Sequence, residues 1–462
     1  MELKMKQKVM VTPAKPTWKG NQSLSVWEQI GCTTYLSITY FYSPNTTPFE
    51  TITQTLIDSL SHTLLHFYPL AGRLRSLDNG GFQLECNEDG VVFVAAELNT
   101  DLSYFEKDYF TPTPETNRFL LPYSNESLPI HERPILLVQL TKLSCGGLSI
   151  GITISHALVD GVSIGNFMTE WAGLTRGLPL QKAPFFDKKA FGVGNRCVGN
   201  PQLFDHSNNF CNKMPFLLKQ PDTAAAAAAT VFTLKLTKEQ VQKLKHKANN
   251  NDLDRRSRPY TCFEALTAHI WRCSIKARKN LSEQVTACLM SIDPRQRLEP
   301  PLPFSYFGRA SFEAMASCEA GELLSKPLSY GVSKVRSVIE MVTNDYIMSA
   351  TEFLKSQQDL TKFQYCNVTT SSNGGGGRNW GNPNICVTSW LNLPYQGIDF
   401  GWGKEIHFGP AYEEFDGGFV IIRKMNNNNN NNNDADDHSV FVFGGLLLQH
   451  VQPFKNYFYH DI

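Results

Sequence analysis

The chain has 462 residues, 42% of them hydrophobic, which predicts a globular protein of two or three domains and excludes a disordered one. Lysine plus arginine and aspartate plus glutamate number 43 each, so no net charge would attract nucleic acid or an anionic membrane, and neither partner is expected. The 11 cysteines are scattered singly, and no apolar signal segment or run of transmembrane length occurs, which together predict free thiols and a cytoplasmic location.

The first half of the chain predicts alternating helices and strands. Every fourth residue from Ile52 to Leu64 is apolar, which is typical of a helix with one face in a core, and Tyr68-Pro69 would end it. Residues 80–98 indicate two strands around a polar turn near residues 87–90. Residues 134–155 indicate a second hairpin.

The second strand of that hairpin, residues 148–155, leads into a histidine. From Leu148 onward, apolar side chains alternate with serine, glycine and threonine, the period of two of a strand with one face in a core. His156 follows, and then come Asp160 and the turn-breaking Gly161. An imidazole at the end of a rigid strand is a candidate for catalysis, although a lone histidine there is more often a packing residue. His156 is the only one of the 11 histidines with an aspartate four positions later, which favours the catalytic interpretation.

The same stretch offers a rival interpretation. Gly161 to Gly165 matches the G-x-S-x-G elbow of serine hydrolases, in which Ser163 would be the nucleophile. An elbow places its serine directly after a strand, whereas Ser163 lies eight residues beyond the last strand residue, so a small residue early in a helix is the simpler interpretation. His62 and His66 have a metal-binding spacing but lack the glutamate of the H-E-x-x-H motif, so no metal site is predicted.

Composition changes between residues 195 and 230, where proline and asparagine are frequent and six alanines follow. This change predicts a crossover linker at residues 201–230 between an N-terminal domain of residues 1–200 and a C-terminal domain of residues 231–462. The second domain begins with a strand, and Thr237 and Gln240 would then form the capping box of a helix. An eight-asparagine run farther on predicts a loop insertion, and a strand and a helix close the chain.

The segment Asp399-Phe400-Gly401-Trp402-Gly403 predicts a tight turn. Two glycines on either side of a large aromatic residue indicate positive φ angles or a close approach of the backbone. Asp399 could cap that turn as easily as take part in chemistry.

Taken together, these segments resemble the plant BAHD family of acyl-CoA-dependent acyltransferases. The likeness is carried by His156-Ala-Leu-Val-Asp160-Gly161, by Asp399-Phe400-Gly401-Trp402-Gly403, and by further blocks at residues 67–74, 261–273 and 293–308. It implies a mixed α/β (α+β) fold of two chloramphenicol-acetyltransferase-like domains with a channel between them. It also implies acyl-CoA as co-substrate, no permanently bound cofactor, no metal and a monomer.

The resemblance assigns roles to several residues. His156 would be the general base that takes the acceptor's proton during direct transfer in a ternary complex. Asp160 would support the site by pairing with Arg295 and fixing the histidine's loop. Thr388 and Trp390 match positions beside the tetrahedral intermediate, where a hydroxyl group could donate to the oxyanion.

The resemblance also makes Asp399 a second active-site residue, supported by Gly401, Trp402 and Gly403. A turn-forming role, in which Asp399 holds the shape of the channel through the two glycines, is the better physical account.

The acceptor is a separate question. The sequence looks most like spermidine hydroxycinnamoyltransferases, and shikimate and quinate transferases are close relatives of these. The latter usually carry an arginine for the acceptor's carboxylate about thirteen residues before the position of Thr388; here that position is Gly375, although Arg378 is nearby. A missing carboxylate handle favours a cationic polyamine, most of all spermidine. Candidate carboxylates for its ammonium groups are Glu413, Glu414 and Asp416.

Three alternatives stay open from the sequence. The first is an O-hydroxycinnamoyltransferase that acts on shikimate, quinate or another alcohol. The second is a serine hydrolase that uses Ser163, and the third is a binding protein that has kept the fold without turnover. One departure from the family has no assigned role: Arg309 stands where the family block usually has asparagine.

Overall fold

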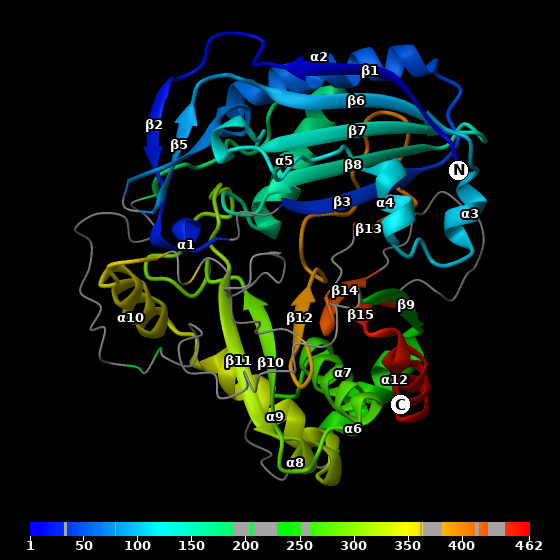
Figure 1. The fold of residues 1–462 in the computed structure, drawn as a ribbon, viewed down its shortest axis with the longest axis vertical. Coiled ribbons are helices and arrows are strands. Elements are labelled where there is room, and N and C mark those ends of the chain that lie inside the picture. The colour runs from blue at the N-terminus through cyan, green and yellow to red at the C-terminus, as the bar shows by residue number, and fades with distance from the viewer. Residues whose placement is uncertain are drawn as a thin grey trace.

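The structure is a computed structural model that describes residues 1–31, 35–78, 80–188, 204, 206, 229–250, 258–360, 363, 381–411, 415–423 and 439–462. Two six-stranded sheets form the upper and lower halves of the molecule (Figure 1). In spatial order the upper sheet contains β1 (Leu3–Val11), β6 (Val91–Leu98), β7 (Leu136–Leu143), β8 (Leu148–Ser155), β3 (Tyr35–Tyr42) and β13 (His407–Pro410). The lower sheet contains β11 (Phe312–Glu319), β10 (Val285–Ile292), β12 (Ile385–Ser389), β14 (Gly418–Arg423), β15 (Val440–Leu446) and β9 (Thr230–Leu236). The predicted mixed α/β fold class is confirmed.

Helices and a third, three-stranded sheet complete the architecture. The small sheet contains β2 (Gly20–Ser23), β5 (Phe82–Cys86) and β4 (Arg73–Ser76). The longer helices are α2 (Phe49–His66), α5 (Gly161–Thr175), α6 (Lys238–Asn249), α7 (Cys262–Arg278), α9 (Leu328–Met341), α10 (Asn344–Lys355) and α12 (Leu448–His460). The shorter ones are α1 (Val26–Gln29), α3 (Leu102–Glu106), α4 (Pro114–Leu120), α8 (Ala320–Ser325) and the 3₁₀ turns η1 (Tyr68–Ala71) and η2 (Ile130–Glu132).

Helices α2 and α5 lie together behind the upper sheet (Figure 1). The predicted stripe of α2 is buried: Ile52, Leu56, Leu60 and Leu64 are at most 3% exposed. The helix ends where predicted, because Pro69 in the following turn cannot continue it. Trp171 of α5 donates its indole N–H to Ser59 Oγ of α2 at 3.0 Å, which joins the two helices.

The β7–β8 hairpin carries the chain towards His156. The two strands pair antiparallel, as predicted. All eight residues of β8 are buried, however, whereas the alternating pattern predicted one buried face. The second face is covered because the chain around Leu120 packs directly on it: a Cβ added at Gly151 would lie 2.1 Å from the Leu120 carbonyl oxygen, so a glycine is needed there.

The two strands predicted around the turn at residues 87–90 are present but belong to different sheets. Strand β5 pairs with β2 and β4, whereas β6 lies between β1 and β7 in the upper sheet. Neighbouring strands often pair, but β6 is buried along nearly its whole length and takes a central position instead.

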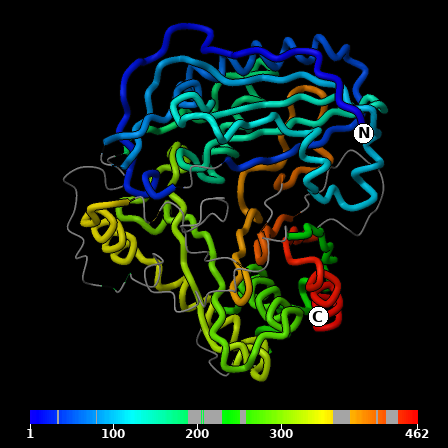
Figure 2. Tube along the Cα trace, in the orientation of Figure 1, coloured from blue at the N-terminus to red at the C-terminus, as the bar shows by residue number. Residues whose placement is uncertain are grey.

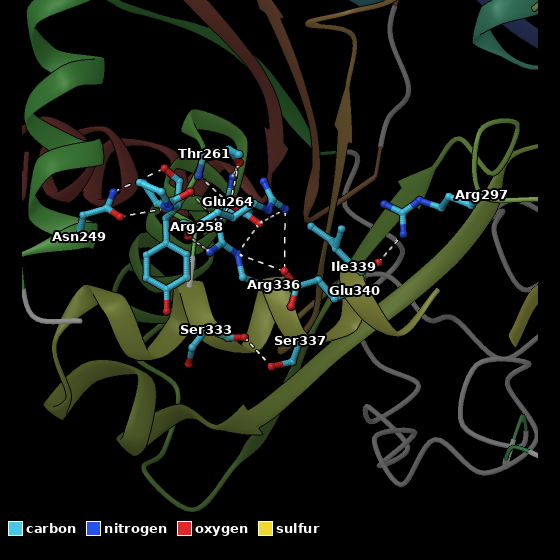
Figure 3. Close-up of polar contacts among 12 residues, drawn as sticks. Asn249, Arg258, Thr261, Glu264, Arg297, Ser333, Arg336, Ser337, Ile339 and Glu340 are labelled. Atoms are coloured by element: carbon cyan, nitrogen blue, oxygen red, sulfur yellow. Dashed lines mark hydrogen bonds and ion pairs between the residues drawn. The ribbon is translucent and has the colours of Figure 1, made fainter. Parts of the chain in front are cut away.

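The lower half buries its core between the second sheet and helices α6, α7, α9 and α12. Thr237 and Gln240 form the predicted capping box of α6. A second capping box, of Thr261 and Glu264, begins α7, and the same Glu264 accepts hydrogen bonds from Arg336 of α9 at 3.0 and 2.7 Å (Figure 3). This bidentate pair is buried, so it fixes α9 against the start of α7.

Strand β13 belongs to the second half of the sequence but pairs with β3 at the edge of the upper sheet. The orange segment that follows β12 accordingly rises from the lower into the upper half of the trace (Figure 2). It places the turn at residues 399–403 against the upper half. The asparagine run and all but a few positions of the 201–230 linker lie outside the described residues, and the division into domains stays a prediction.

Candidate active site

A cavity of about 480 Å³ lies between the two large sheets. Its wall takes residues from β3 and the β8–α5 turn of the upper half and from β10, β12, β14 and β15 of the lower half. The volume falls within the range of small-molecule pockets, about 300–1,000 Å³. The predicted site residues that line it are His156, Asp160, Arg295, Thr388 and Trp390.

His156 stands at the end of β8 with one ring nitrogen occupied. Its Nδ1 lies 2.9 Å from the carbonyl oxygen of Val159. A carbonyl can only accept, so Nδ1 carries the proton in this contact and Nε2 keeps a lone pair. The ring is partly exposed and lines the cavity, which makes Nε2 the nitrogen available to a bound molecule.

The surroundings of His156 keep its imidazole neutral. Burial and, after it, the positive charge of Arg309 lower the pKa of His156 from 6.5 to about 4. The hydrogen bond to Val159 and the carboxylate of Asp160 oppose this shift with smaller effects. Because the pKa lies below neutrality, His156 can accept a proton at pH 7 without first losing one.

Asp160 holds the loop that carries His156. Its carboxylate accepts hydrogen bonds from the backbone N–H groups of Ser163 and Ala310, both at 3.0 Å. The expected ion pair with Arg295 is present, at 2.9 Å from Nη2 to Oδ1 and 2.8 Å from Nη1 to Oδ2. Burial alone would raise the pKa of Asp160, but Arg295 and the two N–H groups hold it below its usual value. The aspartate therefore caps α5 and joins the histidine loop to residues 295–310.

Ser163 is part of the same junction. Its hydroxyl donates to the Gly308 carbonyl at 2.9 Å and accepts from the Gly308 N–H at 3.1 Å. The side chain is fully buried in the first turn of α5 and is not among the residues that line the cavity. This geometry fits the interpretation as a small helix residue and offers no nucleophile to a substrate.

Asp399 lies at its turn and does not line the cavity. Its Oδ1 accepts from the N–H groups of Gly401 and Gly403 at 2.7 and 3.0 Å. These glycines have φ angles of +111° and +103°, which other residues rarely adopt. Arg176 at the end of α5 lies 3.8 Å from Oδ2, and Trp402 stacks on the ring of Phe400. Among the described residues no contact joins Asp399 to His156, and the hydrogen bonds of Asp399 are those of a turn.

Thr388 and Trp390 reach the cavity from the lower half. Thr388 is on β12, which runs parallel to β10 and β14, and Trp390 follows the end of that strand. Trp390 is 4% exposed and packs edge-on against Tyr395 at 4.9 Å between ring centroids. The tryptophan is thus fixed by packing, and the Thr388 hydroxyl stands on a rigid strand.

Arg309 and Glu313 also line the cavity, and the sequence alone predicts no role for them. The only signal was the arginine in place of the family's usual asparagine. Of the acceptor candidates, Gly375, Arg378, Glu413 and Glu414 lie outside the described residues. Asp416 is described, but it pairs with Arg278 at 2.8 Å and does not line the cavity.

Comparison with known proteins places the chain in a family. Residues 1–461 match the Transferase family model. Hydroxycinnamoyl-CoA:piscidic acid hydroxycinnamoyltransferase of Actaea racemosa is 39% identical, with 99% of each chain covered. The chain belongs to the BAHD acyltransferase family. This BAHD acyltransferase has two other relatives of note. The shikimate O-hydroxycinnamoyltransferase of Nicotiana tabacum is 32% identical over 99% of this chain and 100% of the relative. Anthranilate N-benzoyltransferase protein 1 of Dianthus caryophyllus is 30% identical, also over 99% of this chain and 100% of the relative.

Solved structures share the fold of this BAHD acyltransferase. Vinorine synthase superposes with a TM-score of 0.70 at 20% identity and covers 98% of this chain and 96% of its own. F. graminearum TRI101, complexed with coenzyme A and T-2 mycotoxin, superposes with a TM-score of 0.74 at 16% identity over 95% of this chain and 97% of its own. Members of the family use acyl-CoA as co-substrate without a permanent cofactor. Among the described residues, no helix has the length and apolarity to cross a membrane, and no cluster of three or more His, Cys, Asp or Glu could hold a metal ion.

Proposed function

We propose that this BAHD acyltransferase moves a hydroxycinnamoyl group from its CoA thioester directly to a small-molecule acceptor, with His156 as general base. The observation that carries the proposal is the neutral His156 ring, which lines a cavity between the two large sheets and whose Nε2 has no partner among the described residues. The family membership and the hydroxycinnamoyl relatives support the choice of acyl donor.

In the proposed reaction, Nε2 of His156 takes the proton of the acceptor's hydroxyl or amine as that group attacks the thioester carbonyl carbon. The tetrahedral intermediate then collapses, the carbon–sulfur bond breaks, and the CoA thiolate receives the proton from the imidazolium. The product is an ester or amide, together with free CoA, and His156 is neutral again. No acyl-enzyme is needed because both substrates meet in one complex.

The oxyanion of the intermediate needs a hydrogen-bond donor. Thr388 is the candidate because its hydroxyl is on a strand that lines the same cavity as His156. Apolar side chains such as Leu36, Val162 and Leu289 also line the cavity and would pack against an aromatic acyl group. Asp160 and Arg295 would act as positioning residues that hold the histidine loop.

The low pKa of His156 predicts an unusual pH profile. A general base works only when it is unprotonated, so a pKa of about 4 instead of 6.5 extends activity towards lower pH. We expect kcat/KM to stay constant as pH falls from neutrality and to decline only with an apparent pKa near 4. Initial rates of CoA release across this range measure the profile, with a neutral alcohol such as an acid's methyl ester as acceptor, because an amine is protonated and unreactive there and a carboxylic acid titrates near pH 4. A decline centred on pH 6 to 7 would contradict the assignment, provided that circular dichroism shows a folded protein.

Two acceptor classes have support. The sequence favours spermidine, and the carboxylates of Glu126 and Glu313 on the cavity wall would suit its ammonium groups. An acid acceptor is favoured by the names of the relatives, whose acceptors include piscidic acid, shikimate and anthranilate. The monomeric state and the cytoplasmic location stay predictions.

One competition assay tests the proposed function. The purified protein is incubated with p-coumaroyl-CoA and equal amounts of spermidine, shikimate, quinate and piscidic acid, and the products are identified by mass spectrometry. We expect a coumaroyl amide or ester from the wild type and none from His156→Ala. Free coumaric acid as the only product would instead support a hydrolase.

A further inference from the structure

Arg309 is held in place by the residues on both sides of it. Gly308 exchanges hydrogen bonds with the Ser163 hydroxyl, and the Ala310 N–H donates to Asp160. Both partners belong to the turn and helix that follow His156, so the backbone of Arg309 is fixed relative to the imidazole. Its side chain is 4% exposed, lines the cavity and approaches the His156 carbonyl oxygen through Nη1 at 3.5 Å.

The guanidinium of Arg309 is poorly satisfied for a buried group. Its contacts are the 3.5 Å approach to His156 and one ion pair from Nη2 to Glu313 at 3.3 Å, and its buried Nε has no partner among the described residues. Arg295 in the same cavity wall also has a buried Nε without a partner among the described residues, but its Nη groups contact Asp160 and Asp293 at 2.8–3.0 Å, closer than either Nη contact of Arg309. Buried guanidinium groups normally make several short, charge-assisted hydrogen bonds. The Nη groups of Arg295 are therefore committed to the fold, whereas Arg309 lines the cavity and makes only contacts of 3.3 and 3.5 Å through its Nη groups, which leaves them able to bind a ligand.

Of the charged side chains that shift the pKa of His156, Arg309 has the largest effect. Among the charged groups around His156, Arg309 shifts its pKa downward more than Asp160 shifts it upward. An ammonium group beside the imidazole would be repelled by this guanidinium, whereas a carboxylate would be attracted. A planar carboxylate also matches the fork of an arginine, and asparagine at this position could offer only a single uncharged amide donor group.

We propose that Arg309 binds a carboxylate of the acceptor, so that the acceptor is a small hydroxy acid whose hydroxyl group lies at Nε2 of His156. This inference rests on the proposed acyl transfer and names its substrate class as an acid instead of a polyamine. A carboxylate bound at Arg309 would neutralise its charge, which raises the proton affinity of His156 when the acceptor is in place. Substrate binding would thereby strengthen the base.

The test compares acids with their neutral esters in four proteins. Wild type, Arg309→Asn, Arg309→Lys and Glu313→Gln are assayed with p-coumaroyl-CoA and with piscidic acid, shikimate or quinate, each beside its methyl ester. Arg309→Asn introduces the residue that the family usually carries, so the variant is expected to fold. We expect Arg309→Asn to raise KM for the acid about 10- to 100-fold, because one charge-assisted pair of contacts is lost. The same variant should change kcat/KM for the ester less than about threefold. Arg309→Lys should fall between, because an ammonium cannot form the bidentate pair.

Glu313→Gln is the matched control for a structural role of Arg309. It breaks the same ion pair from the other side but frees the guanidinium, so KM for the acid should fall or stay unchanged. A purely structural ion pair would make Arg309→Asn and Glu313→Gln lower kcat/KM alike for acid and ester, and that result overturns the proposal. Wild type that acylates spermidine or the esters but none of the acids also overturns it, while leaving acyl transfer intact. Wild type that acylates no acceptor at all contradicts the proposed function itself, and the inference falls with it.

Discussion

Replacing His156 with alanine is expected to lower kcat/KM for acyl transfer by about 10²- to 10⁴-fold, the usual contribution of a positioned general base. The variant removes the neutral ring, whose Nδ1–H donates to the Val159 carbonyl oxygen and which lines the cavity. Binding of the thioester should change little, because the imidazole acts on the acceptor's proton and not on CoA. Liquid chromatography of released CoA gives the rate, and calorimetric titration with CoA gives the affinity.

His62→Ala is the control for this variant. His62 is exposed on α2, where its Nδ1 contacts the Asp58 carbonyl oxygen, so its loss should leave the rate unchanged. A His156→Ala protein that keeps more than about a tenth of the wild-type rate is incompatible with a general base at this position.

Asp160→Ala is expected to lower the free energy of unfolding by about 3–5 kcal/mol. The substitution removes the buried carboxylate that Arg295 contacts at 2.8 and 2.9 Å and leaves its guanidinium only Asp293, whose side chain is 38% exposed. It also removes the acceptor of two backbone N–H groups. A buried charge without its partner is the costly case, whereas replacement of both partners costs less. Urea unfolding of Asp160→Ala, Arg295→Met and the double variant measures the difference, and the double variant should lose less than the sum.

Glu97→Ala is the matched control, because it breaks an exposed ion pair instead of a buried one. Glu97 lies 3.2 Å from Lys6, and both side chains are about one-third exposed, so its loss should cost less than about 1 kcal/mol. If Asp160→Ala costs no more than Glu97→Ala, the pairing with Arg295 does not hold the histidine loop. A loss of activity in Asp160→Ala without any loss of stability would move Asp160 from a positioning role to a direct one.

Local pattern was enough to predict individual elements. The spacing of apolar residues in α2, the alternation in β8 and the capping box of Thr237 and Gln240 each depend on neighbours within one element. The contacts between segments that lie far apart in the sequence were harder to predict. The sheet partners of β5 and β6, the covering of β8 around Gly151 and the crossing of β13 to the upper sheet depend on contacts between distant segments, which periodicity does not encode.

In the candidate site, too, local patterns could be predicted from the sequence and contacts between distant segments could not. The spacing of His156 and Asp160 is visible along the chain, and their placement at the cavity follows from the strand and helix that they join. Arg309 is visible only as a departure from a family block. Its approach to the His156 carbonyl oxygen spans 153 positions of sequence, so its place beside the base emerges only from the fold.

Direct transfer is the central claim, and one single-turnover experiment tests it most directly. Protein and p-coumaroyl-CoA are mixed in equal amounts without acceptor, and both the intact protein mass and free CoA are measured before and after an acceptor is added. Direct transfer with His156 as base predicts an unmodified protein and intact thioester at first, and then equal amounts of product and free CoA once the acceptor is present. Release of CoA without acceptor, together with a coumaroyl group on the protein, would contradict direct transfer and revive a covalent mechanism.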